Sequence, residues 1–338
     1  MLQRMAEHYQ YVDLYKKAAK EQDPILRLAY IAAFVVAGFS TNPLRVTKYF
    51  NPVIGETFEF IDNELEFRYF GEQVSLQPEV CAFYVEGEGF NLHGNTNTSS
   101  VFSMNSIEFT PIGRTFIKLL DFGDEISYTQ PSAVVRNIIY GAMHIDTAGN
   151  SEITNHTTGD SIELKFYDEG KPKSTDVGIV EGFIKDLDGE IKAKLKGNRT
   201  THFDLIYNNT TITLWKANTT KESEDIQDKK YFFSEYAINL NNDNEAFLRS
   251  LPKTDCRLRK DMRLLEKQMF DESEKEREKI LSKQNKVLDE LKKQKKIYKP
   301  VYFLESYDDV TGELVYNYSR DYWKDKSENN FSHLADIY

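Results

Sequence analysis

The stretch Asp188-Gly189-Glu190-Ile191-Lys192-Ala193-Lys194-Leu195-Lys196 carries the clearest structural signal in the chain. Its Asp-Gly pair is typical of a tight turn between two antiparallel strands. The residues after the turn alternate between charged and apolar side chains, as in a strand with one face in water and the other in a core. Segments 65–69, after an Asp62-Asn63 turn, and 162–166 alternate in the same way. These stretches predict antiparallel β-structure.

Outward from this hairpin, residues 56–250 contain many short strand-like segments separated by Gly, Asn and Asp. Such spacing favours one large antiparallel sheet that is closed or nearly so. Helical segments do not alternate with these strands, which argues against a Rossmann-like or other parallel α/β fold. The predicted fold class is therefore mainly β with flanking helices (α+β).

Helices are expected on both sides of the strands. Asp23-Pro24 suits the start of an N-terminal helix and Gly38 suits its end. Residues 261–297 are typical of one long charged helix, and an aromatic, irregular tail follows from residue 300. Because no linker or repeat interrupts the chain, we expect a single domain over residues 1–338, with helices over 1–40, a β-barrel over 41–250, and a helical subdomain and tail over 251–338.

Composition and motifs narrow the function. The 338 residues include 54 acidic and 43 basic side chains, and the net charge of -11 argues against a nucleic-acid binder. Two cysteines and six scattered histidines lack the spacing of a metal site, so we expect no metal and no cofactor. The sequence has no nucleophile elbow, P-loop or dinucleotide-binding motif, so we expect no catalytic residue and no enzyme activity. The longest apolar run, residues 28–39, is too short to span a membrane, and no export signal is present.

Two stretches resemble a known family: Lys48-Tyr49-Phe50-Asn51-Pro52-Val53-Ile54-Gly55-Glu56-Thr57-Phe58 and Gly71-Glu72-Gln73-Val74-Ser75-Leu76-Gln77-Pro78. The first resembles the K-P-x-N-P-x-x-G-E-x-F-E segment of the oxysterol-binding protein family, and the second resembles its E-Q-V-S-H-H-P-P signature in a degenerate form. Further segments resemble the family in the same order: Ser106-Ile107-Glu108, residues 122–125, residues 137–141, Asn155 with Thr158-Gly159-Asp160, residues 251–259, and Thr311-Gly312-Glu313 with Tyr322-Trp323. The resemblance covers almost the whole chain.

The resemblance implies a large, incomplete antiparallel β-barrel around a lipid tunnel. It also implies a non-enzymatic carrier that binds a sterol or phospholipid and transfers it between membranes, since an apolar tunnel keeps the lipid tail out of water. The expected partners are a lipid ligand and a transiently contacted membrane surface. We expect a cytoplasmic monomer, peripheral to membranes such as those at contacts between the endoplasmic reticulum and the Golgi.

The resemblance further assigns contacts with a lipid head group before and within the signature. Family members hold head-group phosphates with a Lys and an Asn, which Lys48 and Asn51 match, and with the two signature histidines. Here Leu76 and Gln77 stand in place of those histidines. Leu offers no donor and Gln never carries a positive charge, so this change weakens the hold on a phosphate.

A second group of family contacts lies on the C-terminal helix, where the family has Lys, Glu and Arg. Arg277 keeps the positive charge of the Lys, while Leu281 and Asn285 replace the Glu and the Arg. An alignment shifted by a turn would place Lys275 or Lys279 there instead. Together with the signature, these changes predict weakened recognition of phosphatidylinositol 4-phosphate, with Lys48, Asn51, Gln77 and Arg277 as the head-group ligands.

Other positions have structural interpretations. The signature-motif positions are Glu72, Gln73, Val74, Ser75, Leu76 and Pro78. Of these, Glu72, Gln73 and Ser75 are expected to anchor the end of a strand. Phe39 either lines the tunnel or belongs to the core. In the family an amphipathic lid precedes the segment that resembles residues 2–5, so we expect this chain to lack the lid. The lost donors and lid favour an alternative function, a lipid sensor or pseudo-carrier that works at membrane contacts without transfer.

Overall fold

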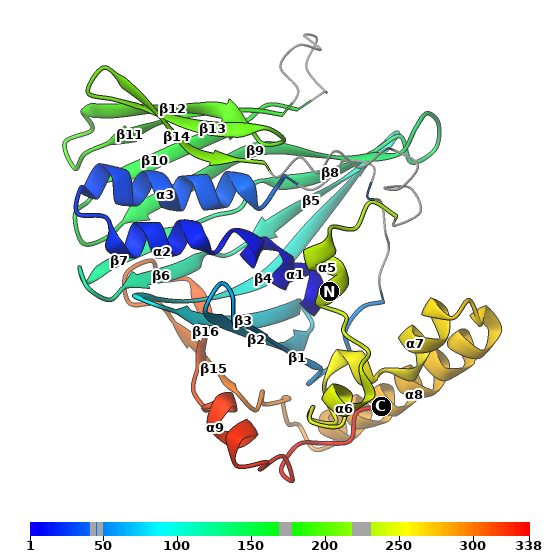
Figure 1. The fold of residues 1–338 in the computed structure, drawn as a ribbon. Helices are drawn as coiled ribbons and strands as arrows, with labels where there is room; N and C mark the ends of the chain where they lie inside the picture. Colours follow the sequence, from blue (N-terminus) through cyan, green and yellow to red (C-terminus); the bar gives the residue numbers. More distant parts are fainter. Residues whose placement is uncertain (41–44, 46–49, 169–177, 218–230) are drawn as a thin grey trace.

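The computed structural model describes residues 1–40, 45, 50–168, 178–217 and 231–338 (Figure 1). It opens with four helical segments: α1 (Leu2–Ala6), the 3-10 helix η1 (Glu7–Tyr11), α2 (Asp13–Lys20) and α3 (Pro24–Ala37). As predicted, Asp23 begins α3, since its carboxylate accepts a 2.8 Å hydrogen bond from the Ile25 N–H. The helix ends at Gly38, also as predicted, where the His8 imidazole leaves little room for a side chain.

Fourteen strands then form one antiparallel sheet. They are β1 (Thr57–Asp62), β2 (Phe67–Leu76), β3 (Glu79–Gly87), β4 (Phe90–Ser103), β5 (Ser106–Ile112), β6 (Thr115–Leu119), β7 (Asp124–Tyr128), β8 (Ser132–Arg136), β9 (His144–Asn155), β10 (Ser161–Phe166), β11 (Ile179–Lys185), β12 (Ile191–Asn198), β13 (His202–Tyr207) and β14 (Thr210–Lys216). Neighbours follow the order β1-β2-β3-β4-β5-β8-β9-β10-β11-β12-β13-β14, and β6 and β7 connect β4 to β9. The predicted class, mainly β with flanking helices, is confirmed.

The turn chemistry explains where strands begin. One carboxylate oxygen of Asp186 accepts hydrogen bonds from the backbone N–H groups of Asp188 and Glu190, and Gly189 has φ +83°, so β12 starts just after the predicted turn. The strand predicted over residues 65–69 begins only at Phe67. The reason is that Asp62 accepts hydrogen bonds from the N–H groups of residues 64 and 65 and keeps them in the turn.

The sheet curves around α2 and α3 (Figure 1). Helix α3 contacts β11, β12, β13 and β14, and α2 contacts β4. Phe34 of α3 stacks on Tyr15 of α2 with 4.0 Å between the ring centroids. A helix that is apolar on nearly every side, as α3 is, is stable only when buried. The helices and the inner face of the sheet therefore share one core.

The C-terminal part differs from the prediction in three places. It contains α5 (Glu235–Asn239), α6 (Glu245–Leu248), the 3-10 helix η2 (Cys256–Leu258), α7 (Lys260–Glu266), α8 (Phe270–Lys293), β15 (Phe303–Tyr307), β16 (Leu314–Tyr318) and α9 (Tyr322–Ser327). Strands do not continue to residue 250, since β14 ends at Lys216 and α5 and α6 follow. The tail after residue 300 is not irregular, since it forms a β-hairpin and a helix.

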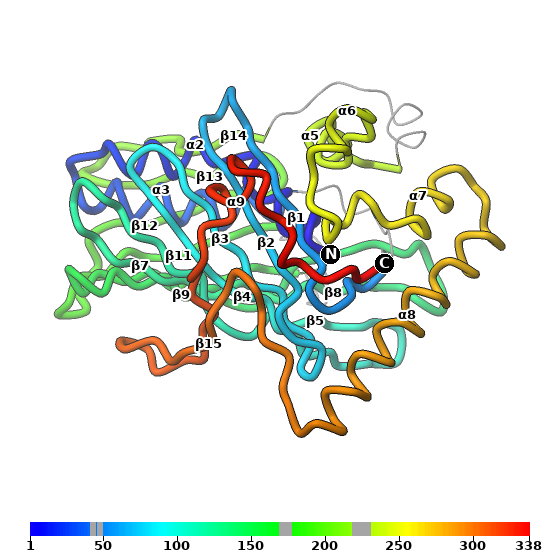
Figure 2. The backbone as a smooth tube through the Cα atoms, turned by 90° about the horizontal axis from the view of Figure 1, so that it is seen from below, coloured from blue at the N-terminus to red at the C-terminus, as the bar shows by residue number. Residues whose placement is uncertain are grey.

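The third correction concerns the single helix predicted over residues 261–297, which is two helices. Gln268 adopts φ +61°, outside the helical region, and the Met269 N–H bonds the Leu264 carbonyl at 3.0 Å. This arrangement caps the end of α7 before α8 begins. The break allows α8 to run across the molecule in a new direction (Figure 2).

The tail is fixed to the outer face of the sheet beside β3 and β4, which β16 contacts (Figures 1 and 2). Glu72 of β2 accepts hydrogen bonds from the N–H groups of Val301 (2.9 Å) and Tyr302 (3.0 Å). Phe70, also on β2, stacks on Tyr322 of α9 with 4.1 Å between the centroids. These contacts form a second, smaller aromatic core that binds the tail to the sheet.

Candidate functional site

A cavity of about 710 Å³ lies between the segment before β1, the β2–β3 turn and helix α8. Its lining residues are Phe50, Asn51, Pro52, Leu76, Gln77, Glu79, Arg259, Leu265, Arg277, Leu281, Gln284, Asn285 and Leu288. Residues 277, 281, 284, 285 and 288 share one face of α8, because side chains four and seven residues apart point the same way. The cavity therefore brings together segments that are more than 200 positions apart in the sequence.

The buried Arg259 holds the segment before β1 in place. Its guanidinium donates to the Asn51 carbonyl at 3.0 Å and to the Glu56 carboxylate at 2.9 Å. It also forms an ion pair with Asp261, at 2.7 Å. Gln284 of α8 accepts a 2.9 Å hydrogen bond from the Ile54 N–H. This segment, η2–α7 and α8 are thus tied together by buried polar contacts at the base of the cavity.

The signature segment divides into an anchored part and an exposed part. Glu72, Gln73 and Val74 are buried, and the Gln73 carboxamide donates to the Ser75 carbonyl at 2.6 Å and accepts a 2.7 Å hydrogen bond from the Cys81 thiol. Ser75 accepts a 3.3 Å hydrogen bond from the Gln77 N–H, and Gln77 and Pro78 are exposed. Gln73 and Ser75 thus form hydrogen bonds within the β2–β3 turn, while the anchoring role of Glu72, Gln73 and Ser75 stays a prediction.

The charges around the cavity are largely compensated. Arg277 forms an ion pair with Glu274 at 2.9 Å, and its guanidinium lies 5.1 Å from the centre of the Phe50 ring. Asn51 donates to the Glu79 carboxylate at 3.2 Å. Partial burial raises the pKa of the Glu79 carboxyl. The cavity thus combines apolar side chains with two paired cations, Arg259 and Arg277, and an acidic group.

The structure places three of the four predicted head-group ligands, Asn51, Gln77 and Arg277, on this one cavity. Lys48 lies outside the described residues. Phe39 is not among the residues that line it: its ring packs edge-on against His8 and Phe166, with centroids 5.4 and 5.8 Å apart.

The roles of Phe50, Glu79 and Arg259 at this site were not predicted from the sequence. The spacing of residues 277, 281, 284, 285 and 288 was a usable signal for the helical face. No comparable local signal identifies Arg259, since its role depends on a contact with residues some 200 positions earlier.

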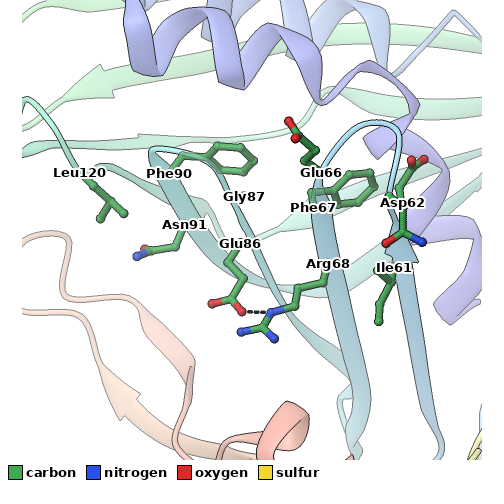
Figure 3. Close-up of a pocket in the computed structure, with 11 residues that line it drawn as sticks. Ile61, Asp62, Glu66, Phe67, Arg68, Glu86, Gly87, Phe90, Asn91 and Leu120 are labelled. Carbon is green, nitrogen blue, oxygen red and sulfur yellow. Dashed lines mark hydrogen bonds and ion pairs between the residues drawn. The ribbon is translucent and has the colours of Figure 1, made fainter. Parts of the chain in front are cut away.

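A second cavity of about 470 Å³ lies where the β1–β2 and β3–β4 turns approach each other (Figure 3). Arg68 of β2 and Glu86 of β3 form an ion pair at its edge, and the Arg68 guanidinium also lies 5.1 Å from the centre of the Trp323 ring. None of the predicted site residues that the structure describes lines this cavity.

Over the part of the chain that the structure describes, no three His, Cys, Asp or Glu side chains are grouped as metal ligands would be. Within the same residues, every helix is too short or too polar to cross a membrane.

Comparison with known proteins decides the family. The family model described as "Oxysterol-binding protein" matches residues 1–327. The chain belongs to the oxysterol-binding protein family. Two of its relatives are oxysterol-binding protein-related protein 1 of Rattus norvegicus, 30% identical over 100% of this chain and 39% of that protein, and oxysterol-binding protein-related protein 2 of Mus musculus, 30% identical over 100% and 79%. The chain spans about two fifths of the length of the first of these relatives.

Solved structures show the same fold. The Osh1 ORD domain in complex with cholesterol has a TM-score of 0.91 and 26% identity, covering 100% of this chain and 84% of that one. The Osh3 ORD of Saccharomyces cerevisiae in complex with PI(4)P has a TM-score of 0.85 and 27% identity, covering 100% and 88%. The sequence-based assignment to the oxysterol-binding protein family is confirmed.

Proposed function

We propose that this chain is a non-enzymatic lipid-binding domain that takes a sterol or other lipid from one membrane and releases it at another. The observation that carries the proposal is the fit of the whole chain, at a TM-score of 0.91, to a family domain in complex with cholesterol. An apolar interior gives a lipid tail a free-energy reason to leave water, at about 0.8 kcal/mol per buried CH₂. Carrying a lipid needs no bond-making step, which agrees with the lack of catalytic motifs in the sequence.

The head-group cavity supports weakened binding of phosphatidylinositol 4-phosphate. Leu76 and Leu281 present only apolar atoms to the cavity. Arg277 is paired with Glu274, and Arg259 with Glu56 and Asp261, so neither is a free cation. A polyphosphate head group would also meet the Glu79 carboxylate. We therefore propose a sterol or neutral-headed lipid as the preferred ligand.

A second candidate function is a lipid sensor or pseudo-carrier that acts at membrane contacts without transferring lipid. The replacement of phosphate ligands by Leu76 and Leu281 favours it, because a carrier that exchanges two lipids must hold both. The two functions differ in two observables, lipid transfer and bound lipid. A carrier moves lipid between vesicles, whereas a pseudo-carrier leaves the distribution of lipid unchanged and purifies without bound lipid.

The domain organisation, oligomeric state and location of the protein are also matters of proposal. We propose that residues 1–338 act as one domain, since the tail is bound to β2 through Glu72 and to β1 through the ion pair of Lys326 with Glu59. We also propose that the protein is a monomer. We further propose a cytoplasmic location, peripheral to the membranes that exchange lipid.

Native mass spectrometry of the purified protein, together with transfer of a fluorescent sterol between two vesicle populations, tests the function. We expect a copurifying lipid and transfer above the rate without protein. An empty protein that transfers nothing would refute the carrier and support the pseudo-carrier. Formation of a chemically altered lipid would refute both.

The head-group proposal has its own test. Restoring both histidines in the double variant Leu76→His/Gln77→His should strengthen binding to phosphatidylinositol 4-phosphate vesicles. Two charge-assisted hydrogen bonds of about 1.5–3 kcal/mol each correspond to roughly two to four decades of affinity. The exposed Leu187→His variant is the control for a histidine placed elsewhere. Equal binding by the double variant and the unaltered protein would contradict the proposed cause of weak recognition.

A further inference from the structure

Two neighbouring turns of the sheet expose an unusual number of large apolar side chains. The end of β4, the turn that follows it and the loop between β8 and β9 carry Val101, Phe102, Met104, Ile139, Tyr140 and Met143, whose exposed fractions lie between 45% and 84%. We call these six residues the apolar tip. Contiguous exposed apolar surface on a folded protein marks a contact with another phase or molecule.

Asn105 ties the two turns together. Its side-chain oxygen accepts hydrogen bonds from the N–H groups of Ile139 (2.9 Å) and Tyr140 (3.2 Å), and its side-chain nitrogen donates to the Tyr140 carbonyl at 3.0 Å. Its own carbonyl accepts a bond from the Ile138 N–H, at 3.3 Å. Asn137 donates from its side chain to the Ala142 carbonyl at 3.0 Å. Several backbone groups of the loop are therefore paired within the protein.

Charge is excluded from the same two segments. Residues 89–107 and residues 137–143 contain no Lys, Arg, Asp or Glu, although the chain as a whole has a net charge of -11. Inserting such a surface into a low-dielectric medium costs no desolvation of charge. The net charge of -11 disfavours attachment of the chain as a whole to an anionic membrane by electrostatic attraction, and an apolar contact does not depend on such attraction.

We propose that the apolar tip inserts into the interfacial region of a lipid bilayer and docks the domain on the membrane. The internal hydrogen bonds of Asn105 meet the main requirement for backbone that enters a membrane, where no water replaces a missing partner. Tyr140 offers an amphipathic ring of the kind that prefers the membrane interface. The side chains project from turns rather than line a groove, which suits a bilayer better than a partner protein.

This docking surface rests on the proposed function, because a lipid carrier has to reach a bilayer to load its cargo. The tip also lies toward the same end of the molecule as α7 and α8, whereas the β11–β12 turn lies at the opposite end (Figures 1 and 2). A domain docked by the tip therefore brings the end that carries the head-group cavity toward the membrane.

A site-specific fluorophore tests the proposal. The variant Met104→Cys is labelled with an environment-sensitive dye, and both native cysteines, Cys81 and Cys256, are buried with raised thiol pKa values and react little. With phosphatidylcholine vesicles we expect a blue shift and a several-fold rise in emission. The same dye at the exposed Leu187, in the β11–β12 turn, should not respond. No change at position 104, or equal changes at both positions, would overturn the proposal.

A second measurement uses unlabelled protein. The triple variant Phe102→Ser/Met104→Ser/Tyr140→Ser should lower the partition coefficient onto phosphatidylcholine vesicles by roughly 100-fold. A Leu187→Ser variant should bind as the unaltered protein does. Unchanged vesicle binding by the triple variant would refute the docking surface. If the triple variant also loses binding to a protein in solution, the apolar tip is a protein-binding surface instead. Copurifying lipid is read separately: its absence from the unaltered protein would refute the proposed function and not the docking surface.

Discussion

The carboxyl group of Glu72 predicts a pH-dependent stability that a single substitution should remove. The side chain is buried, and its oxygens accept hydrogen bonds from the N–H groups of Val301 and Tyr302, which join the tail to β2. Burial raises its pKa from 4.5 to about 7, and the hydrogen bonds only partly oppose this rise. The folded protein therefore holds a proton there that the unfolded chain releases at neutral pH.

The direction and size of the effect follow from this difference. Since the pKa is higher in the folded state, the stabilising contribution is complete below pH 4.5 and is lost as the pH rises through 7. The gap between the two pKa values corresponds to about 3 kcal/mol of unfolding free energy. In the variant Glu72→Gln the group stays neutral at every pH, so this contribution to the pH dependence disappears.

Urea denaturation at pH 5, 6, 7 and 8 measures the effect, followed by fluorescence of the two tryptophans, Trp215 in the main core and Trp323 beside Tyr322 in the tail. We expect the stability of the unaltered protein to fall relative to that of Glu72→Gln by up to about 3 kcal/mol across this range. Other titrating groups affect both proteins equally and cancel in the difference. An exposed control, Glu64→Gln, should follow the unaltered protein. Parallel curves for Glu72→Gln and the unaltered protein would refute the reasoning.

Two further substitutions test the local structure by denaturation. Asp23→Ala removes the cap of α3 and should lower the unfolding free energy by about 1 kcal/mol, whereas the exposed Asp13→Ala, in the first turn of α2, is the comparison. Gly197→Ala should cost about 1–3 kcal/mol or more, because its new Cβ would lie 2.2 Å from the backbone oxygen of His202. A stability equal to that of the unaltered protein would contradict either assignment.

Local sequence signals predicted those parts of the fold that depend on neighbouring residues. The Asp-Gly turn before Ile191 and the start of α3 at Asp23 rest on hydrogen bonds within a few residues, so the amino-acid pattern contains them. The break at Gln268 was missed because a non-glycine residue with φ +61° carries no sequence signature. The β15–β16 hairpin was missed because β16 packs against β3 and β4, which are far away in the sequence, and its residues show no clear alternation.

In the candidate site, too, contacts between residues far apart in the sequence could not be predicted from the sequence. The family resemblance identified Asn51, Gln77 and Arg277, and the structure brings them to one cavity. How strongly the cavity binds a head group depends on the ion-pair partner of Arg277 and on the contact of Asn51 with Glu79. Both contacts arise only in the folded structure, and a sequence motif does not contain them. The departures from the family motif predicted a weaker phosphate site, but only the structure shows that Arg259 and Arg277, among the described residues, are paired with carboxylates.

The salt dependence of vesicle binding distinguishes which surface of the protein contacts a membrane. The second half of α8 is rich in lysine, and a domain that docked through these side chains would bind anionic vesicles less tightly as salt rises. A chain with a net charge of -11 that docks through the uncharged apolar tip behaves in the opposite way, because salt screens the repulsion between protein and vesicle. Flotation with vesicles of one fifth anionic lipid should therefore show binding that increases between about 0.05 and 0.5 M NaCl, as the screening length shortens. Binding to pure phosphatidylcholine should stay nearly constant over the same range. Binding that falls steeply with salt would place the lysines of α8, rather than the apolar tip, at the membrane.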